Sequence, residues 1–156
     1  MRPELIVIHG ISLPPGEFGG AGVERLFTNT LRAEEHAYYK KIVHLRVSAH
    51  VFIRRDGEVT QFVPFNQRAW HAGESCFEER PHCNDFSIGI ELEGCDDVAY
   101  ETVQYQKLAT VVTALVDTYP ELSVQRVVGH CDIAPGRKTD PGPLFDRDFM
   151  RFGGAA

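Results

Sequence analysis

A short, unbroken apolar segment near the start of the chain, LIVIH (residues 5–9), places the strongest constraint on the fold. Such a run is typical of a strand that is buried on both faces. A second short strand is predicted at VQRVVGH (124–130), and it also ends at a histidine. Because sites in open α/β sheets lie where loops converge at strand ends, His9 and His130 are the first candidates for a functional site.

A third predicted strand, FSIGIELEG (86–94), alternates strictly between its two faces. One face carries isoleucine and leucine, and the other carries Gly89, Glu91 and Glu93. Glycine next to a carboxylate indicates that another group approaches the sheet closely on this second face.

Two further patterns complete the predicted architecture. Residues 48–64 are typical of a hairpin, with β-branched and aromatic residues on both sides of an Asp-Gly pair. Apolar residues recur at helical spacing over 105–119, with Thr102 as the expected cap and Pro120 as the stop. Strands and helices alternate without repeats or linkers, so we expect a single mixed α/β domain over 1–156.

Composition excludes several classes of partner. The 22 acidic residues outnumber the 16 basic ones, and a pI near 5.6 argues against a surface for duplex nucleic acid. No apolar run approaches the roughly 18 residues of a membrane span, and the start of the chain lacks the apolar stretch of a signal peptide. We therefore expect a cytoplasmic protein with no nucleic-acid or membrane partner. We also expect a monomer, although composition does not bear on the oligomeric state of the chain. Its four cysteines lack metal-site spacing and are expected to be free thiols.

The segment GHCDIAPGRKTDPGP (129–143) combines three prolines with chemically useful side chains. Each proline ring restricts the backbone, so such a loop can hold His130, Lys138 and Asp140 at low entropic cost. The composition of this loop is that of a site rather than of an ordinary connection.

A catalytic zinc ion takes three protein ligands and leaves one position open for water. His9, His130 and Asp140 would supply these ligands if the proline-rich loop folds back over the two strand ends. His50 and His71 remain alternative ligands, because the sequence alone does not select among the histidines.

Amide hydrolysis at such a metal needs a base for the water and a positive group for the oxyanion. Glu91 suits the first role and Lys138 suits the second. The alternatives are that Glu91 forms a solvated pair with Glu93, and that Lys138 is a surface charge beside Arg137.

Four long segments of the chain carry a family resemblance: VIHGISLPPGEFGG (7–20), HLRVSAHVFIRRDGEVTQFVPFNQRAWHAGES (44–75), CNDFSIGIELEG (83–94) and GHCDIAPGRKTDPGP (129–143). In this order they resemble the AmpD-type amidases, the 1,6-anhydro-N-acetylmuramoyl-L-alanine amidases of cell-wall recycling. The resemblance implies a central mixed β-sheet flanked by α-helices, as in the peptidoglycan-recognition fold, and one catalytic zinc. It also implies cleavage of the amide between the lactyl group of anhydro-N-acetylmuramic acid and L-alanine.

The resemblance assigns roles to the residues considered above. It places the zinc ligands on His9, His130 and Asp140. It favours Glu91 as the general base and assigns stabilisation of the transition state to Lys138. Two alternatives of the same fold remain: a recognition protein that binds muropeptide without cutting it, and an amidase that acts on the intact wall.

The anhydro-muropeptide substrate carries carboxylates, so an acidic protein needs local positive charge to bind it. Arg46 resembles a family arginine that contacts the peptide, and Trp70 and His71 fall where the family lines the cleft. Two positions depart from the family pattern. Gly10 stands where asparagine is expected and His82 where arginine is expected, which affects peptide contacts rather than the metal.

Overall fold

The computed structural model describes residues 1–151, which form one α/β fold. Short 3-10 helices lie at Ala33–Glu35, Cys83–Asp85, Val124–Arg126 and Arg147–Arg151. The strands are β1 (Leu5–Ile11), β2 (Val51–Ile53), β3 (Val59–Gln61), β4 (Cys76–Phe77), β5 (Arg80–Pro81), β6 (Ser87–Glu93) and β7 (Val127–Gly129). The α-helices are α1 (Gly22–Phe27), α2 (Tyr39–Ile42), α3 (Thr102–Thr118) and α4 (His130–Ile133). No helix within 1–151 is both long enough and apolar enough to cross a membrane.

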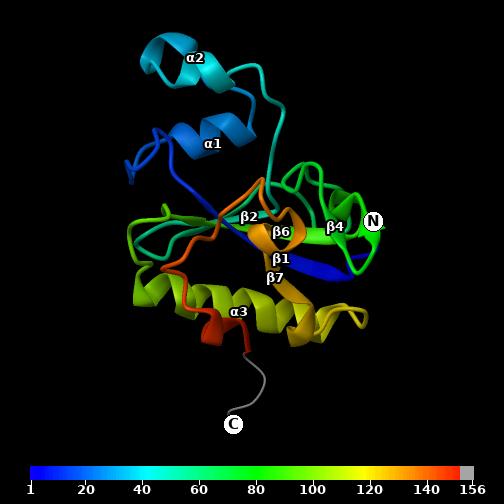
Figure 1. Cartoon of the computed structure of the whole chain (residues 1–156). Coiled ribbons are helices and arrows are strands. Elements are labelled where there is room, and N and C mark those ends of the chain that lie inside the picture. Colours follow the sequence, from blue (N-terminus) through cyan, green and yellow to red (C-terminus); the bar gives the residue numbers. More distant parts are fainter. Residues whose placement is uncertain (152–156) are drawn as a thin grey trace.

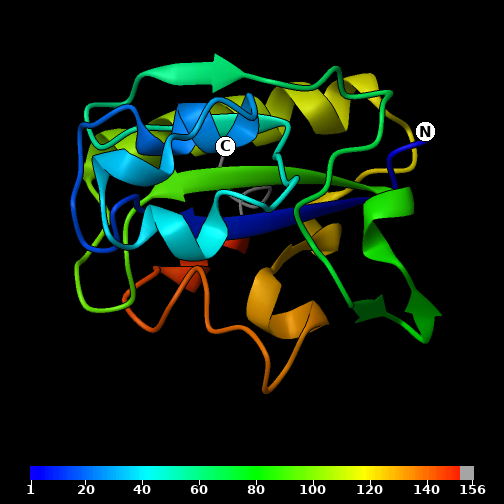
Figure 2. The same cartoon turned by 90° about the horizontal axis from the view of Figure 1, so that it is seen from above.

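Five strands form the central sheet in the order β3-β2-β6-β1-β7. The pairs β2–β6, β6–β1 and β1–β7 are parallel, and β2–β3 is the antiparallel hairpin predicted around the Asp-Gly pair. Seen from above, β1 and β6 run side by side through the middle of the molecule (Figure 2). The expected mixed sheet with flanking helices is therefore confirmed.

Helix α3 covers one face of this sheet (Figure 1). The apolar face of β6, with Ile88, Ile90 and Leu92, packs in the same core cluster as the α3 residues Leu108 and Val112. Burial of each such side chain contributes roughly 1.5–3 kcal/mol, which makes this layer the main stabilising core.

The boundaries of α3 differ slightly from the prediction. Thr102 is its first helical residue, and the cap is Glu101, whose backbone N–H donates to Oε1 of Gln104 at 3.0 Å. The Gln104 side chain thus satisfies a backbone donor at the start of the helix, which places the cap one residue before Thr102. The helix ends before Pro120, as expected.

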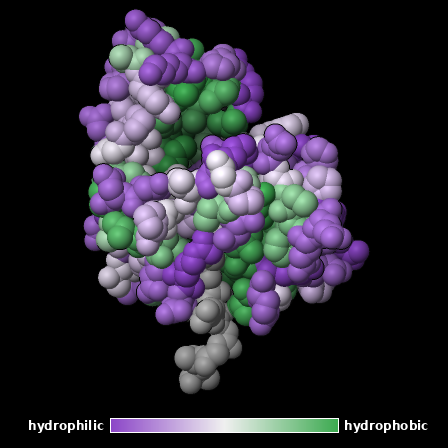
Figure 3. All heavy atoms as spheres, in the orientation of Figure 1, coloured by the Kyte–Doolittle hydropathy of each residue, from purple (hydrophilic) through white to green (hydrophobic). Residues whose placement is uncertain are grey.

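The opposite face of the sheet is covered unevenly. Helices α1 and α2 stand over one part of it, away from α4 and the β4–β5 ribbon (Figure 1). Their apolar residues pack on Phe52 of β2 in a separate cluster that includes Leu26, Phe27 and Tyr39. The space-filling view shows a hollow with apolar atoms beside this lobe (Figure 3).

Both histidine-terminated strands end differently from the prediction. Strand β1 continues past His9 to Ile11, because β6 pairs with it as far as Glu93. Strand β7 ends at Gly129, so His130 is the first residue of α4. His9 thus projects from the face of the central strand β1, and His130 begins α4, directly after the adjacent strand β7.

Candidate active site

Parallel pairing brings the two histidines together. Ile8 of β1 lies opposite Gly129 of β7, so His9 and His130 follow paired positions on adjacent strands. Their Nδ1 atoms lie 3.0 Å apart. Asp140 Oδ2 lies 3.1 Å from each of these nitrogen atoms. Among the described residues, this is the cluster of side chains with metal-ligating atoms.

Two contacts hold the proline-rich loop against the strand ends. The backbone N–H of Cys131 donates to the carbonyl oxygen of Asp140 at 3.0 Å. The hydroxyl of the buried Tyr100 donates to the carbonyl oxygen of Pro141 at 2.7 Å. A Cβ atom at Gly10 would lie 2.2 Å from this hydroxyl oxygen, so the absence of a side chain at position 10 makes room for Tyr100.

The hydrogen-bond network assigns the proton on each imidazole. His130 Nε2 lies 3.0 Å from the carbonyl oxygen of Ala72, which can only accept, so Nε2 carries the hydrogen. His9 Nε2 lies 2.9 Å from His71 Nδ1. The hydroxyl of Ser87 donates to the carbonyl oxygen of Cys83 at 2.6 Å and therefore accepts from His71 Nε2 at 3.2 Å.

Because its Nε2 atom donates to Ser87, His71 has Nδ1 free as an acceptor, and His9 donates to it from Nε2. Burial lowers the pKa of His9 to about 4, so its ring is neutral at pH 7 and its Nδ1 atom is bare. Burial also raises the pKa of Asp140, but the contacts with His130 and His9 outweigh it and hold this pKa below its usual range. His130 carries a hydrogen on Nε2, so its Nδ1 atom, Nδ1 of His9 and Oδ2 of Asp140 converge as three potential ligand atoms. Such a donor set fits a bound cation and little else.

Glu91 lies beside this cluster, opposite His9 in the β1–β6 register. It is 8% exposed, and its Oε2 atom is buried without a hydrogen-bond partner among the described residues. Burial raises the pKa of Glu91 well above its usual value, and the charge of Asp140 adds to this, whereas Lys138 opposes it.

Glu93 is different, although it lies on the same face of β6. The backbone N–H groups of Gly19 and Arg55 donate to its carboxylate at 2.9 and 3.1 Å, and Arg54 approaches it at 3.4 Å. The solvated Glu91–Glu93 pair is therefore absent, since both carboxylates are buried and, among residues 1–151, only Glu93 has hydrogen-bond partners.

A cavity of about 540 Å³ opens at the cluster. Lys138 lines it together with Glu91 and the three clustered residues, and no described carboxylate forms an ion pair with this lysine. Apolar residues of the α1–α2 lobe line the opposite wall, among them Leu26, Phe27 and Ile42. The cavity thus combines a polar floor with an apolar wall.

The structure separates the alternative ligands from the cluster. His50 is fully buried, donates from Nε2 to the carbonyl oxygen of Gln67 at 2.9 Å, and accepts the N–H of Gly89 at Nδ1 at 3.0 Å. Both of its nitrogen atoms are therefore used by the backbone. His71 lies behind His9 and contacts the nitrogen that points away from Asp140.

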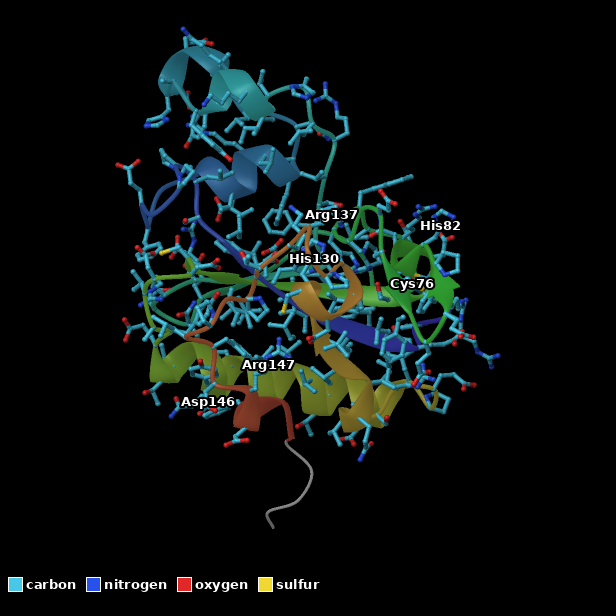
Figure 4. All side chains as sticks on the ribbon, in the orientation of Figure 1. Cys76, His82, His130, Arg137, Asp146 and Arg147 are labelled. Atoms are coloured by element: carbon cyan, nitrogen blue, oxygen red, sulfur yellow. The ribbon has the colours of Figure 1, made fainter. Side chains whose placement is uncertain are left out.

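The other predicted contact residues lie farther along the surface. Trp70 is 54% exposed, with Arg68 stacked 3.9 Å from its ring centroid. Arg46 lines a neighbouring cavity with Trp70 and donates to backbone carbonyl groups of its own loop. His82 lines a larger cavity, about 840 Å³, together with Arg68 and Arg137. Figure 4 shows His130 and Arg137 near the centre of the molecule and His82 to their side.

Sequence reasoning missed Tyr100 and Asn84. Asn84 is buried, and its Oδ1 atom accepts the backbone N–H groups of residues 71 and 72. Gly10 and Gly94 both lie against Tyr100, and these two glycines are the only sequence signal by which a bulky neighbour could have been expected there. The chain carries no comparable signal for Asn84.

The chain is similar to known proteins of one enzyme family. The N-acetylmuramoyl-L-alanine amidase family matches residues 1–143. The 1,6-anhydro-N-acetylmuramyl-L-alanine amidase AmpD of Escherichia coli (strain K12) is 60% identical over 144 residues, which are 92% of this chain and 78% of that enzyme. A crystal structure of a selenomethionine AmpD derivative superposes with a TM-score of 0.94 at 58% identity, covering 97% of this chain and 84% of that one.

A more distant structure is the complex of the Escherichia coli N-acetylmuramyl-L-alanine amidase AmiD with anhydro-N-acetylmuramic acid-L-Ala-D-γ-Glu-L-Lys. It has a TM-score of 0.70 at 30% identity and covers 97% of this chain and 57% of that chain. By fold, by site and by these similarities, the chain belongs to the N-acetylmuramoyl-L-alanine amidase family and, within it, to the AmpD-type amidases that its sequence resembles.

Proposed function

We propose that this protein is a zinc-dependent hydrolase that cleaves the lactyl–L-alanine amide of 1,6-anhydro-N-acetylmuramoyl peptides in cell-wall recycling. We infer that it works in the cytoplasm as a monomer, without a nucleic-acid or membrane partner. The whole chain 1–156 would act as one zinc amidase domain. The AmpD relative carries this activity in its name, and the structure of AmiD has been solved in complex with an anhydro-muropeptide substrate.

His9, His130 and Asp140 would hold the zinc ion. Their ligand atoms are 3.0–3.1 Å apart, close to the roughly 3.3 Å between ligands of a tetrahedral zinc with bonds of about 2.0–2.1 Å. When bound, zinc supplies Lewis acidity, which makes water more acidic and polarises a carbonyl group. Two imidazoles and a carboxylate are a donor set that suits this metal.

Glu91 would take the proton from the attacking water and pass it to the leaving amine. A general base works best when its pKa lies near the working pH, and burial moves the pKa of Glu91 in that direction. The unpartnered Oε2 atom of Glu91 beside three converging ligand atoms is the observation that carries the proposal.

Lys138 would stabilise the negative charge that develops on the carbonyl oxygen. It lines the same cavity as Glu91 and has no competing carboxylate partner among the described residues. The carboxylates of the peptide would meet positive charge along the adjoining cavities, from Arg46 and Arg137, with Trp70 and His71 on the cleft wall.

The test is peptide release from two substrates. Metal-replete protein is incubated with anhydro-muropeptide and with intact sacculi, each with and without a chelator. We expect release from anhydro-muropeptide only, and its loss with the chelator or in Asp140→Ala. Release from sacculi alone would instead indicate a wall-acting amidase, and binding without release a recognition protein.

A further inference from the structure

We propose that the dipeptide His71-Ala72, held in place by Asn84, is a clamp that fixes the orientation and the tautomer of both histidine ligands. His71 and Asn84 are then positioning residues for metal binding. The role of this clamp in metal binding rests on the proposed function, whereas its hydrogen bonds can be observed in metal-free protein.

The first arm of the clamp is the His71 side chain. Its Nδ1 atom accepts from His9 Nε2 at 2.9 Å, and its own Nε2 atom donates to Ser87 Oγ at 3.2 Å. The hydroxyl of Ser87 is fully buried and directed to the carbonyl oxygen of Cys83. The carbonyl group of Cys83 can only accept, so it sets the direction of each hydrogen bond in the series from Ser87 through His71 to His9. The hydrogen of His9 is therefore kept on Nε2, away from Asp140.

The second arm is the carbonyl group of Ala72. It accepts from His130 Nε2 at 3.0 Å and from the guanidinium of Arg137 at 2.7 Å. Arg137 also donates to the carbonyl oxygen of Glu74 at 2.6 Å, which ties the proline-rich loop to this segment. Two adjacent residues thus orient both imidazoles from behind, one through a side chain and one through the backbone.

Asn84 is what fixes the dipeptide. Its Oδ1 atom accepts the backbone N–H of His71 at 3.0 Å and that of Ala72 at 2.9 Å. The side chain is 4% exposed, so water does not compete for these bonds.

Gly89 explains the space that the clamp needs. A Cβ atom at this position would lie 2.4 Å from Cγ of the His71 ring. The ring lies directly on the sheet between β6 and His9, and only glycine leaves room for it. The close approach that the sequence predicts at Gly89 is therefore that of His71.

Groups that orient metal-binding histidines typically change metal affinity by about 10–100-fold when they are removed. We expect this loss of zinc affinity in His71→Leu, measured by competition with a chromophoric chelator. In His71→Asn, the side-chain oxygen takes the place of Nδ1 as acceptor, so this variant should recover most of the affinity. His50→Gln is the matched control, because it removes a buried histidine that contacts neither ligand, and its zinc affinity should remain that of the parent.

The tautomers provide a second measurement that uses metal-free protein. Imidazole ¹⁵N shifts should show the Nε2–H form for His9 in the parent, in His71→Asn and in His50→Gln, and a mixture of forms in His71→Leu. Asn84→Ala should mix the forms of both His9 and His130, whereas Asn84→Asp should retain the parent pattern. A His71→Leu protein with the parent's zinc affinity and tautomers would overturn the proposal. If the parent itself binds no zinc, the proposed function fails, while the tautomer measurement still decides the clamp.

Discussion

Glu91→Gln is expected to make the metal-free protein more stable while it removes most of the activity. The carboxylate of Glu91 has a buried oxygen without a partner, and such an atom costs about 1–3 kcal/mol. Glutamine keeps a polar atom at this position but carries no charge, so the variant should recover the part of the cost that comes from burying the carboxylate charge. Each 1 kcal/mol corresponds to a rise in Tm of roughly 2–4 °C in a chain of this size. Loss of a general base should lower kcat by about 10²–10⁴-fold.

The pH dependence of this effect follows from the raised pKa of Glu91. Above the ordinary glutamate pKa of 4.5, the folded protein retains a proton that the unfolded chain has lost. The free energy of unfolding of the parent therefore falls as pH rises through this range. Glutamine does not titrate, so the advantage of the variant should be small near pH 4 and larger at pH 7.

Glu93→Gln is the matched control, since it makes the same change two residues away on the same buried strand. Glu93 accepts two backbone N–H bonds and contacts Arg54, so the substitution should destabilise the protein by about 3 kcal/mol. Thermal unfolding of chelator-treated protein at pH 5 and pH 8, followed by circular dichroism, measures both variants. Equal losses of Tm for Glu91→Gln and Glu93→Gln would refute the reasoning.

Two further predictions concern the metal and the loop that carries Asp140. Zinc present at a thousand times its Kd should raise the free energy of unfolding by about 4 kcal/mol, and His9→Ala should abolish this increase in denaturant titrations. Tyr100→Phe removes the hydrogen bond to Pro141 and should cost about 1 kcal/mol together with some zinc affinity, and unchanged values of both would contradict the assigned contact. Gly10→Ala should destabilise the parent by about 1–3 kcal/mol, because the added Cβ collides with the Tyr100 hydroxyl. The cost should be clearly smaller in the Tyr100→Phe background, where that hydroxyl is absent. Additive effects of the two substitutions would argue against the collision.

Local patterns were sufficient to predict the sheet, the hairpin and the long helix. Alternation along 86–94 placed Gly89 and both glutamates on one face, as observed. Alternation could not distinguish Glu91 from Glu93, because residues two apart in a strand lie on the same face. They differ only in the residues that contact them in the folded protein. Their different roles come from Arg54 and the backbone of residue 19, which are distant in the sequence.

The histidines show the same limit more sharply. His50 and His71 were equal alternatives to His9 by residue type. In the folded protein His50 is buried, His71 is half-buried, and both lie beside Gly89. His50 is excluded as a ligand because the backbone uses both of its nitrogen atoms, whereas His71 retains one acceptor atom for another histidine. Whether a histidine binds metal or positions a ligand therefore depends on which nitrogen atom the backbone leaves free. That choice is made by strand pairing and by Asn84, and so it becomes visible only when the chain is folded.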